Sequence, residues 1–293
     1  MALPGHFAMV VVSRSAISAA VMLNPSFQFL AADRYGPYKT VELSTEPSSA
    51  ELSALARRGI DGVLLLPRER SGGTLDLGWL SHLNLRFFQV QARRRLGGIP
   101  AETLRDLEVL WVDGTLAEAV QPTAAPKLRS LAIPGGALGG DLTELQCLEF
   151  LALERLVPGP PRQWSGSLDS LRELRLGFKA GSSDYVVEPR LSGSPRLERV
   201  DVEGATVASL DEFGRLPRLR RLSVQLPRNR RQRRQISLAP LMGCPMLEEL
   251  LIADSGRLLD ARVLDDLPHL RAVTAYRDGL DPWPGDRDWL RKL

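Results

Sequence analysis

The chain has 293 residues, of which 44% are hydrophobic and 25% charged, and its formal net charge at pH 7 is +3. These values are typical of a folded chain and exclude a disordered one. No uninterrupted apolar run approaches the ~18 residues of a membrane helix, so we expect no membrane association. The two cysteines, Cys147 and Cys244, lie far apart and form no C-x-x-C pair. Their small number favours a reducing compartment over a disulfide-rich extracellular scaffold.

Residues 1–37 begin the chain with an irregular pattern. An apolar run at 7–12 predicts a strand, residues 15–23 predict a short helix, and Asn24-Pro25 indicates a turn. Residues 7–23 also form the segment that most resembles a targeting signal, but they lack a basic start, and Arg14 interrupts the apolar run. We therefore interpret 1–37 as an N-terminal cap and expect a cytoplasmic protein.

From residue 38 onward one apolar pattern recurs, with large apolar residues at its first, fourth and sixth positions. This spacing fits neither a helix face nor simple strand alternation, and it predicts a short strand entered through a bend. Successive copies start 20 to 28 residues apart. Eleven copies begin at Tyr38, Ile60, Leu85, Leu107, Leu128, Leu148, Leu171, Leu197, Leu219, Leu247 and Leu270. Near the third copy, a start at Leu80 competes with the start at Leu85.

A repeat of 20–29 residues built on L-x-x-L-x-L resembles the leucine-rich-repeat superfamily. The resemblance covers roughly residues 38–276 and implies an α/β solenoid of about eleven repeats. Its curved parallel β-sheet would form the concave face, with short helices and loops on the convex face. Few lysines and abundant Ala, Gly and Pro suggest a GC-rich, bacterial genome.

The segments between the strands carry helix signals. Ser48 followed by Glu51 reads as a capping box, and Pro100 marks a second helix start. After Tyr276 the pattern stops, and residues 277–293 read as a C-terminal cap with a turn and a short helix over 286–293. Together, 1–37, 38–276 and 277–293 form one continuous structural domain.

Charges alternate in sign directly after the first position of each copy. Equivalent residues on adjacent parallel strands stand about 4.8 Å apart, so a column of like charges would be repulsive. Alternation therefore supports the register, and we assign it a structural role. The residues are Lys39, Asp61, Arg86, Glu108, Arg129, Glu149, Arg172, Glu198, Arg220, Glu248 and Arg271.

The third, fifth and seventh positions are expected to face outward on the concave sheet. They are apolar in the first half of the chain and charged in the second, which predicts a two-part surface for binding another protein. The alternative is that the N-terminal segment or a loop covers the apolar part. The predicted partner-binding residues are Leu64, Phe87, Val109, Trp111, Phe150, Arg175, Arg199, Asp201, Arg221 and Tyr276.

A run of arginines between two strands offers a second hypothesis, the binding of a polyanion such as nucleic acid or an anionic surface. No aromatic residues are interleaved with it, so a solvated loop is the favoured interpretation. The arginines are Arg228, Arg230, Arg231, Arg233 and Arg234.

Catalytic signatures are missing from the sequence. There is no G-x-S-x-G, phosphate loop, H-E-x-x-H or metal-spaced Cys/His cluster, so we expect no enzyme, no cofactor and no metal. The family resemblance implies a bacterial cytoplasmic interaction protein. It could serve as an inhibitor or immunity protein, an effector-recognition subunit or an assembly scaffold.

Overall fold

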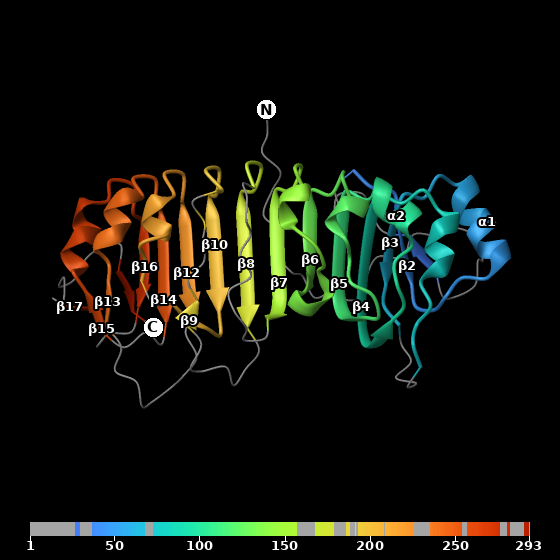
Figure 1. Ribbon diagram of the computed structural model, residues 1–293, viewed down its shortest axis with the longest axis horizontal. Coiled ribbons are helices and arrows are strands. Elements are labelled where there is room, and N and C mark those ends of the chain that lie inside the picture. Colours follow the sequence, from blue (N-terminus) through green and yellow to red (C-terminus); the bar gives the residue numbers. More distant parts are fainter. Residues whose placement is uncertain are drawn as a thin grey trace.

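Each copy of the apolar pattern forms one strand of a 13-stranded sheet, in which the strands follow one another in chain order (Figure 1). The computed structural model describes residues 27–29, 37–67, 73–156, 168–178, 186–187, 191, 193–207, 209–225, 235–253, 257–275, 280–281 and 290–292. Strand β1 pairs antiparallel with β2, and every later neighbour in this sheet is parallel. The strands are β1 (Phe27–Phe29), β2 (Thr40–Leu43), β3 (Gly62–Leu65), β4 (Phe87–Leu96), β5 (Val109–Leu116), β6 (Ser130–Pro134), β7 (Phe150–Leu156), β8 (Glu173–Phe178), β10 (Arg199–Glu203), β12 (Arg221–Gln225), β14 (Glu249–Ala253), β16 (Ala272–Ala275) and β18 (Leu290–Lys292).

The strand register aligns the fourth position of every predicted copy. Val63 pairs with Phe88 at one end of the sheet, and Leu222 pairs with Leu250 towards the other. The start at Leu85 is therefore confirmed over the competing start at Leu80. The full row is Val41, Val63, Phe88, Leu110, Leu131, Leu151, Leu174, Val200, Leu222, Leu250 and Val273.

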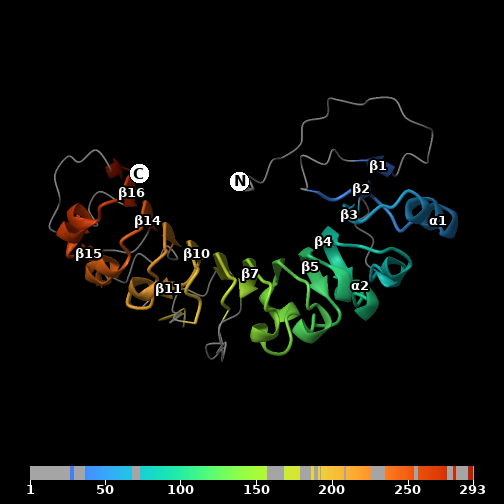
Figure 2. The ribbon, with the colours of Figure 1, turned by 90° about the horizontal axis from the view of Figure 1, so that it is seen from above.

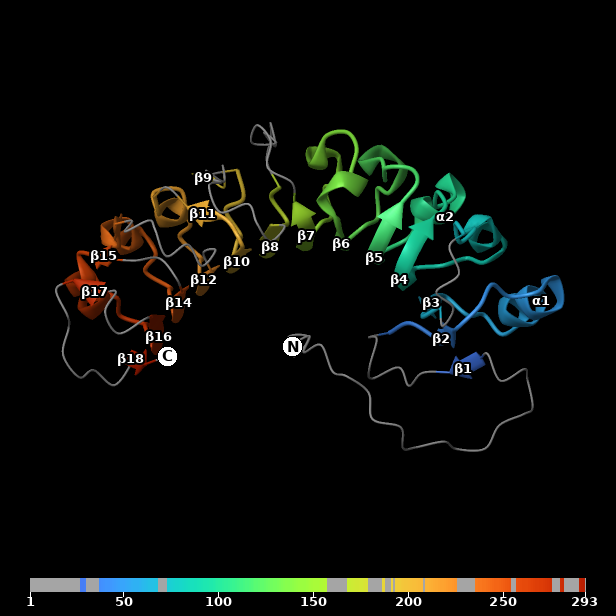
Figure 3. The same ribbon diagram turned by 90° about the horizontal axis from the view of Figure 1, so that it is seen from below.

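The first, fourth and sixth positions supply one continuous core. In the copy that begins at Leu219, the side chains of Leu219, Leu222 and Val224 are each 0% exposed. The sheet lines the inner side of an arc and the short helices lie on its outer side, as seen from above and from below (Figures 2 and 3). The predicted leucine-rich-repeat solenoid is confirmed.

The convex side consists mainly of single helical turns, because an interval of about 22 residues leaves little chain once the strand and its two bends are built. At Ser48 the predicted capping box is present, and the second helix begins directly after Pro100. The helices are α1 (Ser49–Arg57) and α2 (Ala101–Asp106), with 3₁₀ turns η1 (Gly78–His82), η2 (Pro122–Ala124), η3 (Gly135–Ala137), η4 (Leu142–Glu144), η5 (Phe213–Arg215), η6 (Ala239–Gly243) and η7 (Ala261–Asp266). Two small parallel sheets pair β9 (Val186–Val187) with β11 (Thr206–Val207), and β13 (Gln235–Ser237) with β15 (Arg257–Leu259) and β17 (Leu280–Asp281).

The structure corrects the sequence interpretation at both ends of the repeats. The helix predicted over 286–293 is wrong for Leu290–Lys292, which form β18 and extend the sheet by pairing parallel with β16. Tyr38 was expected at an inward first position, but its ring instead lies on Phe87, an outward residue. The strand at 7–12 and the helix at 15–23 lie outside the described residues, whereas Phe27–Phe29 adds an antiparallel edge strand.

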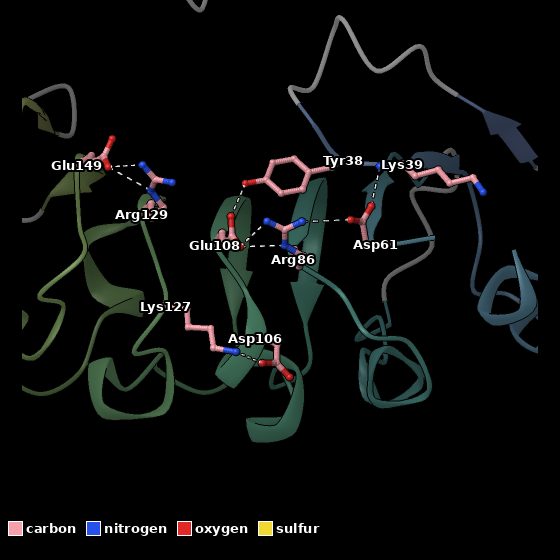
Figure 4. A network of polar contacts seen from close by, with 9 residues as sticks. All are labelled: Tyr38, Lys39, Asp61, Arg86, Asp106, Glu108, Lys127, Arg129 and Glu149. Carbon is pink, nitrogen blue, oxygen red and sulfur yellow. Dashed lines mark hydrogen bonds and ion pairs between the residues drawn. The ribbon is translucent and has the colours of Figure 1, made fainter. Parts of the chain in front are cut away.

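The alternating charges form a ladder along the entry edge of the sheet (Figure 4). Arg86 pairs with Glu108 at 2.7 Å and with Asp61 at 3.7 Å, so it joins three adjacent strands. Further ion pairs join Arg129 to Glu149 at 2.5 Å and Arg220 to Glu248 at 2.8 Å. The backbones of the ladder residues are also joined. The carbonyl oxygen of each ladder residue accepts a hydrogen bond from the backbone N–H of the ladder residue in the following repeat, as from Glu108 N to Arg86 O at 2.8 Å. Alternation thus places attractive neighbours where the backbone register is set.

We predict that Glu108→Lys destabilises the fold by about 1–2 kcal/mol, because it places three cations side by side and removes two attractive contacts. Urea unfolding of the wild type and the variant measures this loss. Glu118→Lys has the same charge change at an exposed site outside the ladder and should cost less than about 0.5 kcal/mol. Equal losses in the two variants would contradict a specific role for the ladder.

Candidate functional site

Aromatic rings form a continuous row across the first half of the concave face. The ring of Tyr38 stacks on Phe87 with centroids 5.6 Å apart, and Phe87 meets Trp111 edge-on at 6.1 Å. Trp111 in turn lies 6.5 Å from Phe150. The row therefore spans the strands from β2 to β7.

The Tyr38 end of the row is closed, and its far end is open. Phe87 is 2% exposed beneath Tyr38, and Leu64 on the neighbouring strand is 5% exposed. Both were predicted to face outward and contact a partner, and this degree of burial shows that the predicted exposure is wrong. Val109, Trp111 and Phe150 remain partly exposed, so the accessible part of the aromatic row lies on β5–β7.

A hydrogen bond to the neighbouring strand orients Trp111. Its indole N–H donates to Ser130 Oγ on β6 at 2.8 Å, which draws the ring across that strand towards β7. Ala132 and Ala152 occupy the fifth positions of β6 and β7 and are too short to displace it. The two rings thus form a shallow apolar floor with an oriented indole, here called the aromatic floor (Trp111 and Phe150).

A lattice of four charges adjoins the aromatic floor. The Arg175 guanidinium lies 5.4 Å from the centre of the Phe150 ring and contacts Glu173 on its own strand at 2.6 Å. On β10, Arg199 and Asp201 are the register partners of Glu173 and Arg175. Opposite charges therefore alternate along and across the strands, with cross-strand separations of 3.6 Å for Arg175 to Asp201 and 3.7 Å for Arg199 to Glu173.

The lattice holds its charges partly out of water. Burial raises the pKa of Asp201, and the nearby guanidiniums of Arg199, Arg175 and Arg221 oppose that rise. Because each member already has opposite-charge neighbours, the lattice presents fixed, oriented groups rather than a free ion site. Such an arrangement favours selectivity over raw affinity.

Tyr38 occupies a protected setting at the edge of the aromatic row. Its hydroxyl donates to Glu108 Oε2 at 3.0 Å, and the Arg86 guanidinium lies 5.3 Å from its ring centre (Figure 4). Burial, together with this hydrogen bond to a carboxylate, raises the pKa of Tyr38 to about 12. The tyrosine therefore links the charge ladder to the concave face.

Most of the predicted partner-binding residues converge on one region. Val109, Trp111, Phe150, Arg175, Arg199 and Asp201 lie on β5, β7, β8 and β10. Arg221 lies one strand further along and pairs with Glu249 at 3.2 Å. Tyr276 and the arginines Arg228, Arg230, Arg231, Arg233 and Arg234 lie outside the described residues, and the polyanion hypothesis stays a prediction.

Sequence reasoning did not identify two features of this surface. Tyr38 was assigned inward because its spacing matched the repeat, and no local signal shows that its ring turns over. Glu154 on β7 was not chosen, although it occupies a seventh position and could have been found from the outward register.

Metal-ligand clusters and membrane-spanning helices are both absent from the described part of the chain. No group of three or more His, Cys, Asp or Glu residues there could hold a metal ion. No described helix has the length and apolar character needed to cross a membrane. Cys147 and Cys244 are both free thiols, exposed and buried respectively, and burial raises the pKa of Cys244 to about 11.

No protein-family model matches the sequence, and no curated protein is significantly similar to it. Among solved structures, the chain is similar to an internalin of Listeria monocytogenes, with 12% identity and a TM-score of 0.35. That likeness covers 80% of this chain and 84% of the internalin chain. The strand register, and not this distant likeness, defines the fold as a leucine-rich-repeat solenoid.

We predict that Tyr38 ionises well above an ordinary tyrosine, with a pKa of about 12. The difference between near-ultraviolet titrations of the wild type and Tyr38→Phe isolates its tyrosinate signal. Because the folded pKa exceeds the unfolded value of about 10, the associated stability is intact below pH ~10 and is lost as the pH rises towards 12. Glu108→Gln should lower the midpoint, and a midpoint near 10 in the wild type would contradict the geometry.

Proposed function

We propose that this chain is a non-enzymatic protein-interaction module, whose partner docks on the concave face between β5 and β10. The observation that supports this most strongly is the aromatic floor, where Trp111 and Phe150 stay partly exposed within a sheet that buries most of its other large apolar side chains. Aromatic residues of this kind supply much of the binding energy at protein interfaces.

The floor is arranged to bind with little loss of side-chain freedom. Trp111 is oriented by its hydrogen bond to Ser130, and Phe150 is flanked by Trp111 and by Arg175. Rotamers fixed before binding lower the entropic cost of association. A partner that covers the two rings would therefore gain hydrophobic free energy at a small ordering cost.

The adjoining charge lattice restricts which partner fits. A partner covering Glu173, Arg175, Arg199 and Asp201 must offer complementary polar groups, because an apolar cover would take these charged groups out of water without compensation. The polar part of the surface thus selects among proteins that the aromatic floor would otherwise accept. The biological role would be that of an inhibitor or immunity protein, an effector-recognition subunit or an assembly scaffold in the cytoplasm.

We predict that the double variant Trp111→Ala/Phe150→Ala loses its partner without unfolding. Each ring contributes about 2 kcal/mol if it is a binding hot spot, so affinity should fall by about 1,000-fold when both are removed. Tagged wild type and variant are compared by quantitative capture from the source cell lysate, with thermal unfolding as the folding control.

Met242→Ala is the matched control, because Met242 is a 50% exposed apolar residue on the convex turn η6. Proteins that bind the concave face are lost from the double variant and retained by Met242→Ala. If a folded double variant captures the same proteins as the wild type, the aromatic floor is not the binding surface.

A further inference from the structure

The concave face is acidic where the aromatic floor lies, although the whole chain has a net charge of +3. The outward residues of β5 to β10 include five carboxylates. The same strands contribute only three guanidiniums to this region, even when Arg155 is counted. The carboxylates are those of Asp113, Glu154, Glu173, Asp201 and Glu203, and the guanidiniums are those of Arg155, Arg175 and Arg199. This local reversal of sign disfavours a polyanion on the concave face.

Three of these carboxylates are already neutralised by arginines. Glu173 and Asp201 belong to the charge lattice, while Asp113 pairs with Arg155 at 2.7 Å. Glu154 and Glu203 form no ion pair with any described residue. They are the two acidic groups of this region that keep capacity for a cation from outside.

The two carboxylates flank a strand position with no side chain. Gly177 on β8 is the register partner of Glu203, and a Cβ atom added to Gly177 would collide with Glu154 Oε2. The side chain of Glu154, which comes from β7, therefore lies over the backbone of Gly177. Partial burial raises the pKa of Glu154 and the negative charge of Glu203 raises it further, while the charges of Arg175 and Arg155 only partly oppose the rise. A cation placed above Gly177 would relieve this repulsion from both sides.

The acidic pair and the aromatic floor lie close enough to serve one bound segment. Phe150 and Glu154 stand four residues apart on β7, about 13 Å along the strand. An extended segment covers that distance in four residues. One peptide could thus place an apolar side chain on the floor and a cation over Gly177.

We propose that the partner presents a basic segment, with an apolar side chain on Trp111 and Phe150 and a Lys or Arg side chain between Glu154 and Glu203. This inference rests on the proposed function and adds the chemistry of the partner to it. The two interacting side chains lie four positions apart in the bound segment, because side chains of an extended segment alternate between its two faces.

The test is selection from a random peptide library displayed on phage, with the immobilised full chain as bait. The wild type is expected to enrich peptides in which Lys or Arg lies four positions from an aromatic or large aliphatic residue. Enriched peptides are then synthesised and titrated against Glu154→Gln/Glu203→Gln, for which affinity should fall about 10-fold or more. The matched control, Glu102→Gln/Glu118→Gln, removes two exposed carboxylates elsewhere and should change affinity less than about 2-fold.

Folding of the test variant is read from its thermal unfolding. Replacing two mutually repelling carboxylates by amides of the same shape should leave the midpoint unchanged or raise it. Enrichment of acidic or uncharged peptides, no enrichment at all, or equal affinity for the wild type and Glu154→Gln/Glu203→Gln would overturn the proposal. Failure of the proposed function is distinguishable, because it appears as unchanged partner capture by Trp111→Ala/Phe150→Ala.

Discussion

In-register parallel stacking is the constraint from which the rest of this structure follows. Every repeat returns its strand to the same edge, so residues at equivalent positions form columns about 4.8 Å apart. A column of apolar residues is buried and becomes core, as with Val200, Leu222 and Leu250. A column of charged residues must alternate in sign, and the ladder through Asp61, Arg86 and Glu108 does so. Columns of outward residues form a continuous surface. When the residue type in such a column changes from one repeat to the next, the polarity of the surface changes along the arc.

The concave face therefore has three consecutive zones with different physical properties. Near β2 to β4, Tyr38 stacks on Phe87, and the outward residues Leu64 and Phe87 are buried there. From β5 to β7 the aromatic floor remains accessible, and from β8 to β10 the charges pair with one another. Arg175 joins the last two zones because it lies over Phe150 and also contacts Glu173. A partner that spans this junction would contact apolar and charged groups together.

The sequence predicts those parts of the fold that depend on period alone. Spacing located all eleven copies, and the alternating charges gave an independent check on their register. The sequence could not predict features that arise when a single side chain points in a different direction from the equivalent residues of the other repeats. Tyr38 satisfies the apolar pattern, yet its hydroxyl reaches Glu108, three strands away in the sheet. The burial of Leu64 and Phe87 likewise depends on their surroundings in space. Leu290 was misassigned because one strand without a full repeat pattern resembles a short helix.

Hydroxyl-radical footprinting of the free chain tests the inward and outward assignment most directly, because it compares residues of the same chemical type within one sample. Trp79 and Phe213, which are 8% and 0% exposed, provide internal references for Trp111 and Phe150. The structure predicts that Trp111 is oxidised faster than Trp79, and Phe150 faster than Phe213. Protection of Trp111 and Phe150 equal to that of these core residues would contradict an accessible concave surface.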